Sequence, residues 1–225
     1  MTNQLTRAMH KIKNEILSLG AMVEDRFKKA IYAVKTKDLE LAIQIIETDY
    51  LVDAQEIEVE EECVKTLALY HPVATDLRLI TAVIKINNDL ERIADYAVNI
   101  ARRFKTSGQR SNSFEYDYTA MAEQAAKMLK FSLDALVSLD RDLAYKVREM
   151  DEEVNTMRNE AYRVMKDAIR KNPEQVEEII NMYLISRHIE RVGDHTKNIA
   201  EEVIYLIEGE IIRHSGIPIK KITRK

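Results

Sequence analysis

A segment of eleven residues occurs twice in the chain, and this repetition constrains the possible folds more than any other feature of the sequence. Residues 91–101 (ERIADYAVNIA) align with residues 190–200 (ERVGDHTKNIA) at an offset of 99, and six of the eleven positions are identical. Upstream, an offset of 102 aligns Asp38, Asp49, Val52 and Glu58 with Asp140, Asp151, Val154 and Glu160. Self-similarity at a fixed period indicates that one structural unit has been duplicated within the chain.

Helix-breaking residues are scarce, and they recur at matching places in the two halves. The 225 residues include only five Gly and three Pro. Breaks fall at residues 36–38 and 71–72 in the first half and at 138–140 and 172–173 in the second, with a polar linker at 106–113 between them. The amphipathic segments between breaks are about 30 residues long, and long helices with short connections pack as antiparallel bundles. We therefore predict an all-α fold of two tandem three-helix bundles, six long helices in total.

The predicted bundles cover residues 1–106 and 112–209, and a basic tail follows at 210–225. The basic character of the tail comes from Lys220, Lys221, Arg224 and Lys225. We interpret it as a solvated end of the chain, with a contact to an acidic partner or to membrane headgroups as the alternative. The net charge of −4 provides no strong field that would attract nucleic acid, so no nucleic-acid partner is expected.

Other features of the composition favour a cytoplasmic protein. No stretch approaches the roughly 18 consecutive apolar residues that a membrane span needs, and residues 1–7 contain no apolar signal core. Cys63 is the single cysteine, which excludes an internal disulfide and a cysteine-based zinc site. We interpret Cys63 as a structural thiol.

Acidic residues form a stripe along the last predicted helix of each unit. Residues spaced i, i+4 and i+8 lie on one side of a helix. The two sets are Glu91, Asp95 and Asn99 in the first unit, and Glu190, Asp194 and Asn198 in the second. Because apolar residues lie on the opposite side of this helix, we expect the acidic stripes to face away from the core.

The middle helix of each unit adds a second acidic stripe. In the first unit it consists of Asp49, Asp53, Glu56 and Glu60, and in the second it is reduced to Asp151 and Asn155, with Arg158 next. Facing pairs of carboxylates on neighbouring helices suit hard cations such as Mg²⁺, Mn²⁺, Fe or Zn²⁺. The alternative is a solvated acidic face that Arg92 and Arg191 partly neutralise. The presence of two copies favours metal sites.

Catalytic motifs are missing from the sequence, so we predict no catalytic residues and no enzymatic activity. The sequence contains no glycine-rich phosphate loop, G-x-S-x-G, H-E-x-x-H or EF-hand pattern. No histidine lies three residues after a glutamate, which excludes the Glu-x-x-His signature of di-iron carboxylate bundles. His188, at the position of Asp89 in the first unit, is expected on the surface or behind a metal ligand. A carboxylate-bundle metalloprotein and a passive helical scaffold are the hypotheses that the residues alone leave open.

Three segments resemble the signature of the PhoU family: residues 69–78 (LYHPVATDLR), 88–101 (NDLERIADYAVNIA) and 186–200 (SRHIERVGDHTKNIA). The resemblance extends from the first helix to about residue 209. It implies six helices in two similar three-helix bundles, and a cytoplasmic and often dimeric regulator of phosphate uptake. The implied partners are the ATPase subunit of the phosphate ABC importer and the sensor histidine kinase of the phosphate regulon, which the protein keeps off when phosphate is plentiful.

The resemblance also implies metal clusters held by paired E(D)-x-x-x-D motifs. One set would be Asp49 and Asp53 with Glu91 and Asp95, and the other Asp151 and Asn155 with Glu190 and Asp194. Four further residues could form hydrogen bonds to these ligands without contacting the metal: Arg92, Asn99, Arg191 and Asn198. The amide of Asn155 is a weaker ligand for a hard metal than a carboxylate, so we predict that the second site holds metal less tightly or holds fewer ions. The identity of the metal stays open among Fe, Zn, Mn and Mg.

Overall fold

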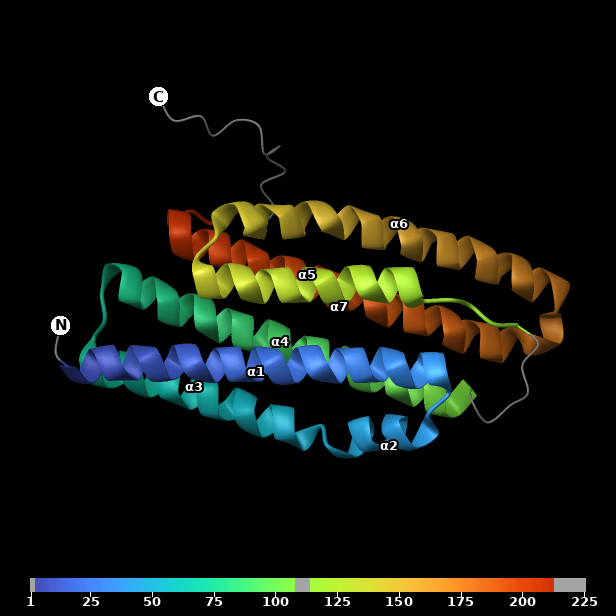
Figure 1. The fold of residues 1–225 in the computed structure, drawn as a ribbon, viewed down its shortest axis with the longest axis horizontal. Helices are drawn as coiled ribbons and strands as arrows, with labels where there is room; N and C mark the ends of the chain where they lie inside the picture. The colour runs from blue at the N-terminus through green and yellow to red at the C-terminus, as the bar shows by residue number, and fades with distance from the viewer. Residues whose placement is uncertain (1–2, 108–113, 213–225) are drawn as a thin grey trace, which may run out of the picture.

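The computed structural model describes residues 3–107 and 114–212, and it places nearly all of them in helices. The elements are α1 (Asn3–Thr36), α2 (Leu39–Glu47), α3 (Tyr50–Tyr70), α4 (Ala74–Ser107), α5 (Thr119–Ser138), α6 (Arg141–Lys171), the 3₁₀ turn η1 (Pro173–Gln175) and α7 (Val176–Glu208) (Figure 1). None of the described residues lies in a strand. The predicted all-α fold is confirmed.

The helices form two repeats that pack side by side. The first repeat comprises α1 to α4 and the second comprises α5 to α7, with α1 lying against α5 and α4 against α7. Lys85 of α4 pairs with Glu202 near the end of α7, and Arg103 bonds Asn181 near its beginning, so α4 and α7 run antiparallel. The two middle segments, α2–α3 and α6, lie at opposite edges of the molecule (Figure 1). The contact between the repeats is therefore made by their first and last helices.

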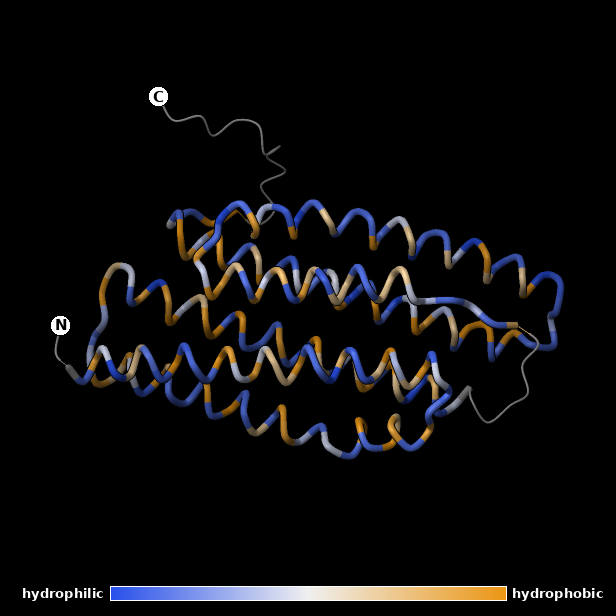
Figure 2. The backbone as a smooth tube through the Cα atoms, in the orientation of Figure 1, coloured by the Kyte–Doolittle hydropathy of each residue, from blue (hydrophilic) through white to orange (hydrophobic). Residues whose placement is uncertain are grey.

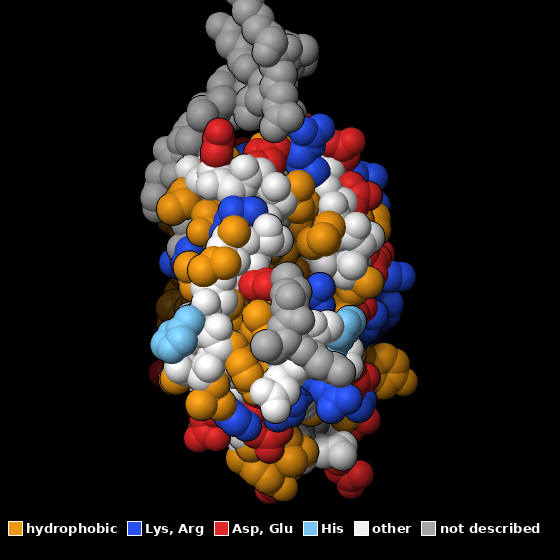
Figure 3. Space-filling model, turned by 90° about the vertical axis from the view of Figure 1, so that its left-hand side faces the viewer, with side chains coloured by type: hydrophobic (Ala, Val, Ile, Leu, Met, Phe, Trp, Pro, Cys, Tyr) orange, Lys and Arg blue, Asp and Glu red, His pale blue; other side chains and the backbone are white. Residues whose placement is uncertain are grey.

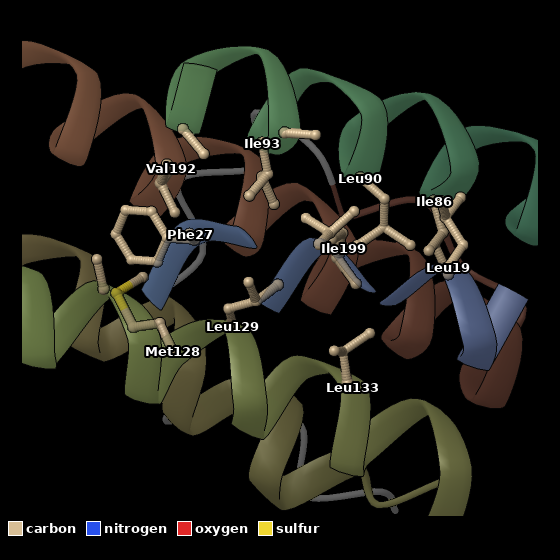
Figure 4. Close-up of a cluster of buried hydrophobic side chains, with 14 of the residues drawn as sticks. Leu19, Phe27, Ile86, Leu90, Ile93, Met128, Leu129, Leu133, Val192 and Ile199 are labelled. Carbon is tan, nitrogen blue, oxygen red and sulfur yellow. The ribbon is translucent and has the colours of Figure 1, made fainter. Parts of the chain in front are cut away.

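One continuous hydrophobic core joins the two repeats. Hydrophobic residues recur along every helix (Figure 2), and side chains from α1, α4, α5 and α7 point toward one another in the centre (Figure 4). The central group includes Leu19, Phe27, Leu90, Ile93, Met128, Leu129, Val192 and Ile199. A Cβ atom on Gly20 of α1 would lie 2.7 Å from Leu133 Cδ2 of α5. Glycine at this position therefore allows the two repeats to approach closely.

The helix beginnings predicted at the middle segments are confirmed in their physical detail. The side chain of Asp38 accepts a hydrogen bond from the backbone N–H of Leu41 at 2.9 Å, and Asp140 accepts one from Leu143 at 3.0 Å. Each carboxylate satisfies one of the free N–H groups at a helix N-terminus. The two repeats therefore use the same cap at the same place.

The prediction of a single middle helix in the first repeat is wrong, because the helix ends after α2 and restarts at α3. The buried side chain of Arg26 donates hydrogen bonds to the carbonyl oxygens of Ile45 at 3.2 Å and Thr48 at 2.6 Å. Its guanidinium also lies 2.9 Å from the Asp49 carboxylate. These contacts stabilise the break by satisfying carbonyl groups at the end of α2. Met128 occupies the corresponding position in the second repeat, where α6 is continuous.

Parts of four predictions lie outside the described residues. These are residues 1–2 of the bundle expected at 1–106, most of the linker at 106–113, the first residues of the bundle expected at 112–209, and the basic tail from residue 213 onward, with Lys220, Lys221, Arg224 and Lys225.

Candidate metal-binding clusters

The first acidic cluster consists of Asp49 at the N-cap position of α3, Asp53 and Glu56 on α3, and Glu91 and Asp95 on α4. Burial raises the pKa of Glu91, and the negative charges of Asp95, Glu56 and Asp53 raise it further. Burial likewise raises the pKa of Asp49, which also experiences Asp53 and Asp95. The structure thus brings the two predicted stripes of the first repeat within electrostatic reach of each other across the α3–α4 contact.

Positive charge reaches only part of the first acidic cluster. Arg26 pairs with Asp49, and the half-exposed Arg92 lies 3.6 Å from Glu91 and 3.5 Å from Asp95. Exposed ion pairs of the latter kind contribute little, because both ends remain hydrated. These two arginines form ion pairs with three of the five carboxylates of the cluster, so negative charge is in excess. Burial raises the pKa values of Asp49, Glu56 and Glu91, and repulsion between the carboxylates raises them further.

The second acidic cluster, formed by Asp151, Asn155, Glu190 and Asp194, has a different environment. Asp151 is 4% exposed and Glu190 is 5% exposed, so the expectation of a solvent-facing stripe is wrong for these two residues. Lys197 donates to Asp151 at 2.9 Å, and Asn155 donates to the same oxygen at 3.2 Å. This carboxylate is therefore held by an ion pair and a hydrogen bond within its own repeat.

Two arginines neutralise the other buried carboxylate. Arg158 lies 3.2 Å from Glu190, and Arg187 lies 3.0 Å from it. Asp194 is partly exposed, and Arg191 approaches it at 3.2 Å. Burial raises the pKa of Asp194, and the neighbouring Glu190 and Asp151 raise it further. The second acidic cluster is thus an internal ion-pair network.

The cationic residues of the second acidic cluster replace acidic or uncharged residues of the first repeat. Arg158 stands where the first repeat has Glu56, and Lys197 stands where it has Val98. Arg187 replaces Asn88 in the same way. Sequence reasoning identified Arg158 and overlooked Lys197 and Arg187, although the change from Val98 to Lys197 falls inside the repeated eleven-residue segment.

The fit of these clusters to a metal is incomplete. Within residues 3–107 and 114–212, no three His, Cys, Asp or Glu side chains converge closely enough to hold a metal ion. Asn99 accepts a long hydrogen bond from Arg102, and Asn198 donates to Asp89 of α4 at 3.2 Å. Asn198 therefore faces the other repeat, whereas we expected it to support Asp194. The proposed ligands of the first acidic cluster need a side-chain rearrangement to meet one ion.

Histidines mark the contact between α4 and α7. His195 Nδ1 lies 2.8 Å from Asp89 Oδ1, and the ring of Tyr96 packs at 5.8 Å from His188 and 5.6 Å from His195. Burial lowers the pKa of His188 to about 4, and the positive charges of Arg103 and Arg187 act in the same direction. His188 belongs to the contact between the repeats, so the expectation that it lies on the surface or behind a metal ligand is corrected.

Cys63 is fully buried in α3, and burial raises the pKa of its thiol to about 12. Since the thiolate is the reactive form of cysteine, this environment suits a packing role. No helix among the described residues is long and apolar enough to cross a membrane.

Taken together, the fold and the clusters define an all-helical protein of two repeated three-helix units, in which each unit carries an acidic cluster between its middle and last helices. The PhoU domain model matches this chain twice, at residues 16–104 and 118–203. The chain belongs to the PhoU family. The resemblance noted in the sequence is confirmed.

Relatives match over nearly the whole chain. The phosphate-specific transport system accessory protein PhoU homolog of Pseudomonas aeruginosa is 34% identical over 96% of this chain and 90% of its own length. The phosphate-specific transport system accessory protein PhoU of Serratia marcescens is 30% identical over 96% of this chain and 89% of its own.

Solved structures have the same architecture. The crystal structure of PhoU from Pseudomonas aeruginosa superposes with a TM-score of 0.87, at 34% identity over 91% of this chain and 99% of that one. The phosphate transport system regulatory protein PhoU from Streptococcus pneumoniae gives a TM-score of 0.82, at 26% identity over 92% and 98% of the two chains.

Proposed function

We propose that this protein is an accessory regulator of phosphate transport that acts by docking to other proteins. The observation that carries the proposal is the double PhoU match, at residues 16–104 and 118–203, together with relatives named as accessory proteins of the phosphate-specific transport system. In this role the protein works in the cytoplasm beside the phosphate ABC importer. Its partners are the importer's ATPase subunit and the sensor histidine kinase of the phosphate regulon, and it restrains both when phosphate is plentiful. A homodimer is part of this proposal.

The chemistry of the described residues supports docking over catalysis. Cys63 has a raised pKa in a buried position, and His188 has a lowered pKa and is packed against Tyr96. Neither arrangement presents an activated nucleophile or base to solvent. Long helices with exposed outer faces suit contacts between proteins.

We further propose that the first acidic cluster binds a divalent or iron-type cation, with Fe, Zn, Mn and Mg as the candidates. Asp53, Glu91 and Asp95 would supply oxygen ligands, and Asp49 would join them if its contact with Arg26 opened. The excess negative charge supports this proposal, since a cation would relieve it and link α3 to α4. In the second acidic cluster, Arg158 and Lys197 already supply that positive charge. The predicted weaker second site follows from the same reasoning.

Deletion of the gene tests the regulatory role. We expect the deletion strain to express alkaline phosphatase and take up phosphate at high rates in phosphate-rich medium, and the intact gene to restore repression. Purified importer ATPase subunit and the cytoplasmic part of the kinase should each bind the full chain. Unchanged phosphatase and uptake in the deletion strain, together with no binding to either partner, would contradict the proposal.

A further inference from the structure

The outer face of α3 carries an apolar stripe that no other part of the described chain covers. Tyr50, Ile57 and Val64 lie seven residues apart and are 63%, 52% and 54% exposed. The intervening positions Ala54, Glu61 and Ala68 are also exposed and complete a heptad pattern, so these six residues form one line, the α3 stripe. The buried residues of α3, including Val52, Val59 and Cys63, lie on the opposite side of the helix.

The second repeat shows that the duplicated fold does not require such a stripe. At an offset of 102, the equivalents of the α3 stripe on α6 are Glu152, Thr156, Asn159, Arg163, Lys166 and Arg170. All six are polar or charged, and α6 has the ordinary surface of an amphipathic helix. The apolar residues on α3 are therefore a property of the first repeat alone.

The position of α3 leaves this face open. Within the described chain α3 packs against α1 and α4, and it lies at the edge of the molecule away from the second repeat (Figure 1). Further exposed apolar residues lie at the end of α3, in the turn before α4 and at the start of α4: Leu69, Val73 and Leu77. The end view shows hydrophobic side chains gathered at the lower edge, on the side where α2 and α3 lie (Figure 3). Several exposed apolar residues on one side of a helix are typical of a binding site.

The charges around the α3 stripe select the kind of partner. Asp53 and Glu60 border it on one side, Glu58 and Lys65 border it on the other, and Glu61 lies within it. Two copies of this face would bring acidic residues against acidic residues, which opposes self-association. A helix with apolar anchors flanked by Lys or Arg would match both the shape and the charge of this face.

We propose that the α3 stripe binds a basic amphipathic helix of a partner protein. This rests on the proposed function, in which the protein acts by docking, and assigns a surface and a partner chemistry to that docking. The apolar anchors of the partner cover Tyr50, Ile57 and Val64. Its cations pair with Glu58, Glu60 and Glu61. The corresponding face of α6 does not take part.

The probe for this proposal is a designed 21-residue helical peptide with Leu at the first and fourth heptad positions and Lys at the flanking ones. Its binding to the full chain is measured by fluorescence anisotropy at low and high salt. The test variant is Ile57→Asn/Val64→Lys, which introduces the residues found at the matching positions of α6. The control is Asn159→Ala/Lys166→Ala on α6. All four substituted side chains are exposed on the surface of a helix. Circular dichroism should therefore show the helicity and melting temperature of the wild type for both variants.

We expect the stripe variant to bind at least tenfold more weakly, the α6 control to bind as the wild type does, and added salt to weaken the wild-type complex. The same peptide with Glu in place of Lys should not bind. Equal binding by the stripe variant, or equal binding of the acidic peptide, would overturn the proposal. A wild-type dimer in light scattering that the stripe variant abolishes would assign the face to a second copy and would also overturn it. So would tighter stripe-dependent binding of a peptide of residues 213–225.

The importer ATPase subunit and the kinase then separate this inference from the proposed function. If they bind the wild type and lose binding to the stripe variant, both are supported. If they bind both forms equally, the α3 inference fails and the docking function stands. If neither binds the wild type while the basic peptide binding still depends on Ile57 and Val64, the assigned partners fail and the α3 surface stands.

Discussion

The two acidic clusters occupy equivalent places in a duplicated fold and differ in how their charge is balanced. In the first, burial raises the pKa of Glu91, and repulsion from the nearby carboxylates raises it further. In the second, Lys197 and Arg158 reach the buried carboxylates of Asp151 and Glu190. After a duplication, a shared backbone can therefore keep one copy open to an external cation while the other copy supplies its own positive charge.

Removal of a cation from the second acidic cluster should have the largest effect on stability. Lys197→Met leaves the Asp151 carboxylate buried with Asn155 as its remaining hydrogen-bond donor. Loss of one partner of a buried ion pair costs about 3 kcal/mol, so the free energy of unfolding measured in urea should fall by about this amount. Arg92→Met, which removes the exposed cation of the first acidic cluster, should change it by less than about 1 kcal/mol. Similar losses in the two variants would contradict the contrast between the clusters.

Acid should weaken the contact between the repeats through His188. The pKa of His188 is lowered to about 4 in the folded protein, so between pH 6.5 and 4 the unfolded chain binds more protons at this residue. The contribution of His188 to the free energy of unfolding should therefore fall as the pH drops through this range, by up to about 3 kcal/mol. The carboxylates with raised pKa values act in the opposite direction, so the measured quantity is a difference between proteins.

His188→Asn should flatten the dependence of urea unfolding on pH between 7 and 4.5 relative to the wild type. His10→Asn, at an exposed position on α1, serves as the control and should leave the slope unchanged. A His188→Asn variant with the wild-type slope would show that His188 is not the group responsible.

Neutralisation of one glutamate in each cluster should give effects of opposite sign. In metal-free buffer at pH 7, Glu91→Gln relieves repulsion with Asp95 and should stabilise the protein by roughly 0.5 kcal/mol. Glu190→Gln removes the charge that pairs with Arg158 and Arg187 and should destabilise it by roughly 2 kcal/mol. Two changes of the same sign would show that the clusters are alike.

Most of the fold could be predicted from the periodicity and the internal repeat of the sequence. Helix caps and amphipathic patterns depend on residues that are close together along the chain. The sequence predicted breaks at residues 36–38 and 138–140, and the structure begins a helix after each of them, capped by Asp38 and Asp140. The break before α3 could not be predicted in this way, since it depends on Arg26, which is 22 residues away along the chain from Thr48.

The acidic residues of the candidate site could be predicted from the sequence, whereas their burial and their ion-pair partners could not. The sequence located both sets of acidic residues and the departure at Asn155. It did not reveal that Lys197 and Arg187 point at the second set, because side-chain direction across a helix contact depends on packing. The ion pairs with Lys197, Arg187 and Arg158 offset the cost of burying Asp151 and Glu190.

Metal content measured after equilibrium dialysis against Mn²⁺ tests the contrast between the clusters most directly. The proteins compared are the wild type, Glu91→Ala/Asp95→Ala and Glu190→Ala/Asp194→Ala, each with its folding checked by circular dichroism. We expect the first double variant to lose most of the bound Mn²⁺ and the second to retain most of it. Equal losses from the two variants, or a larger loss from the second, would contradict this contrast.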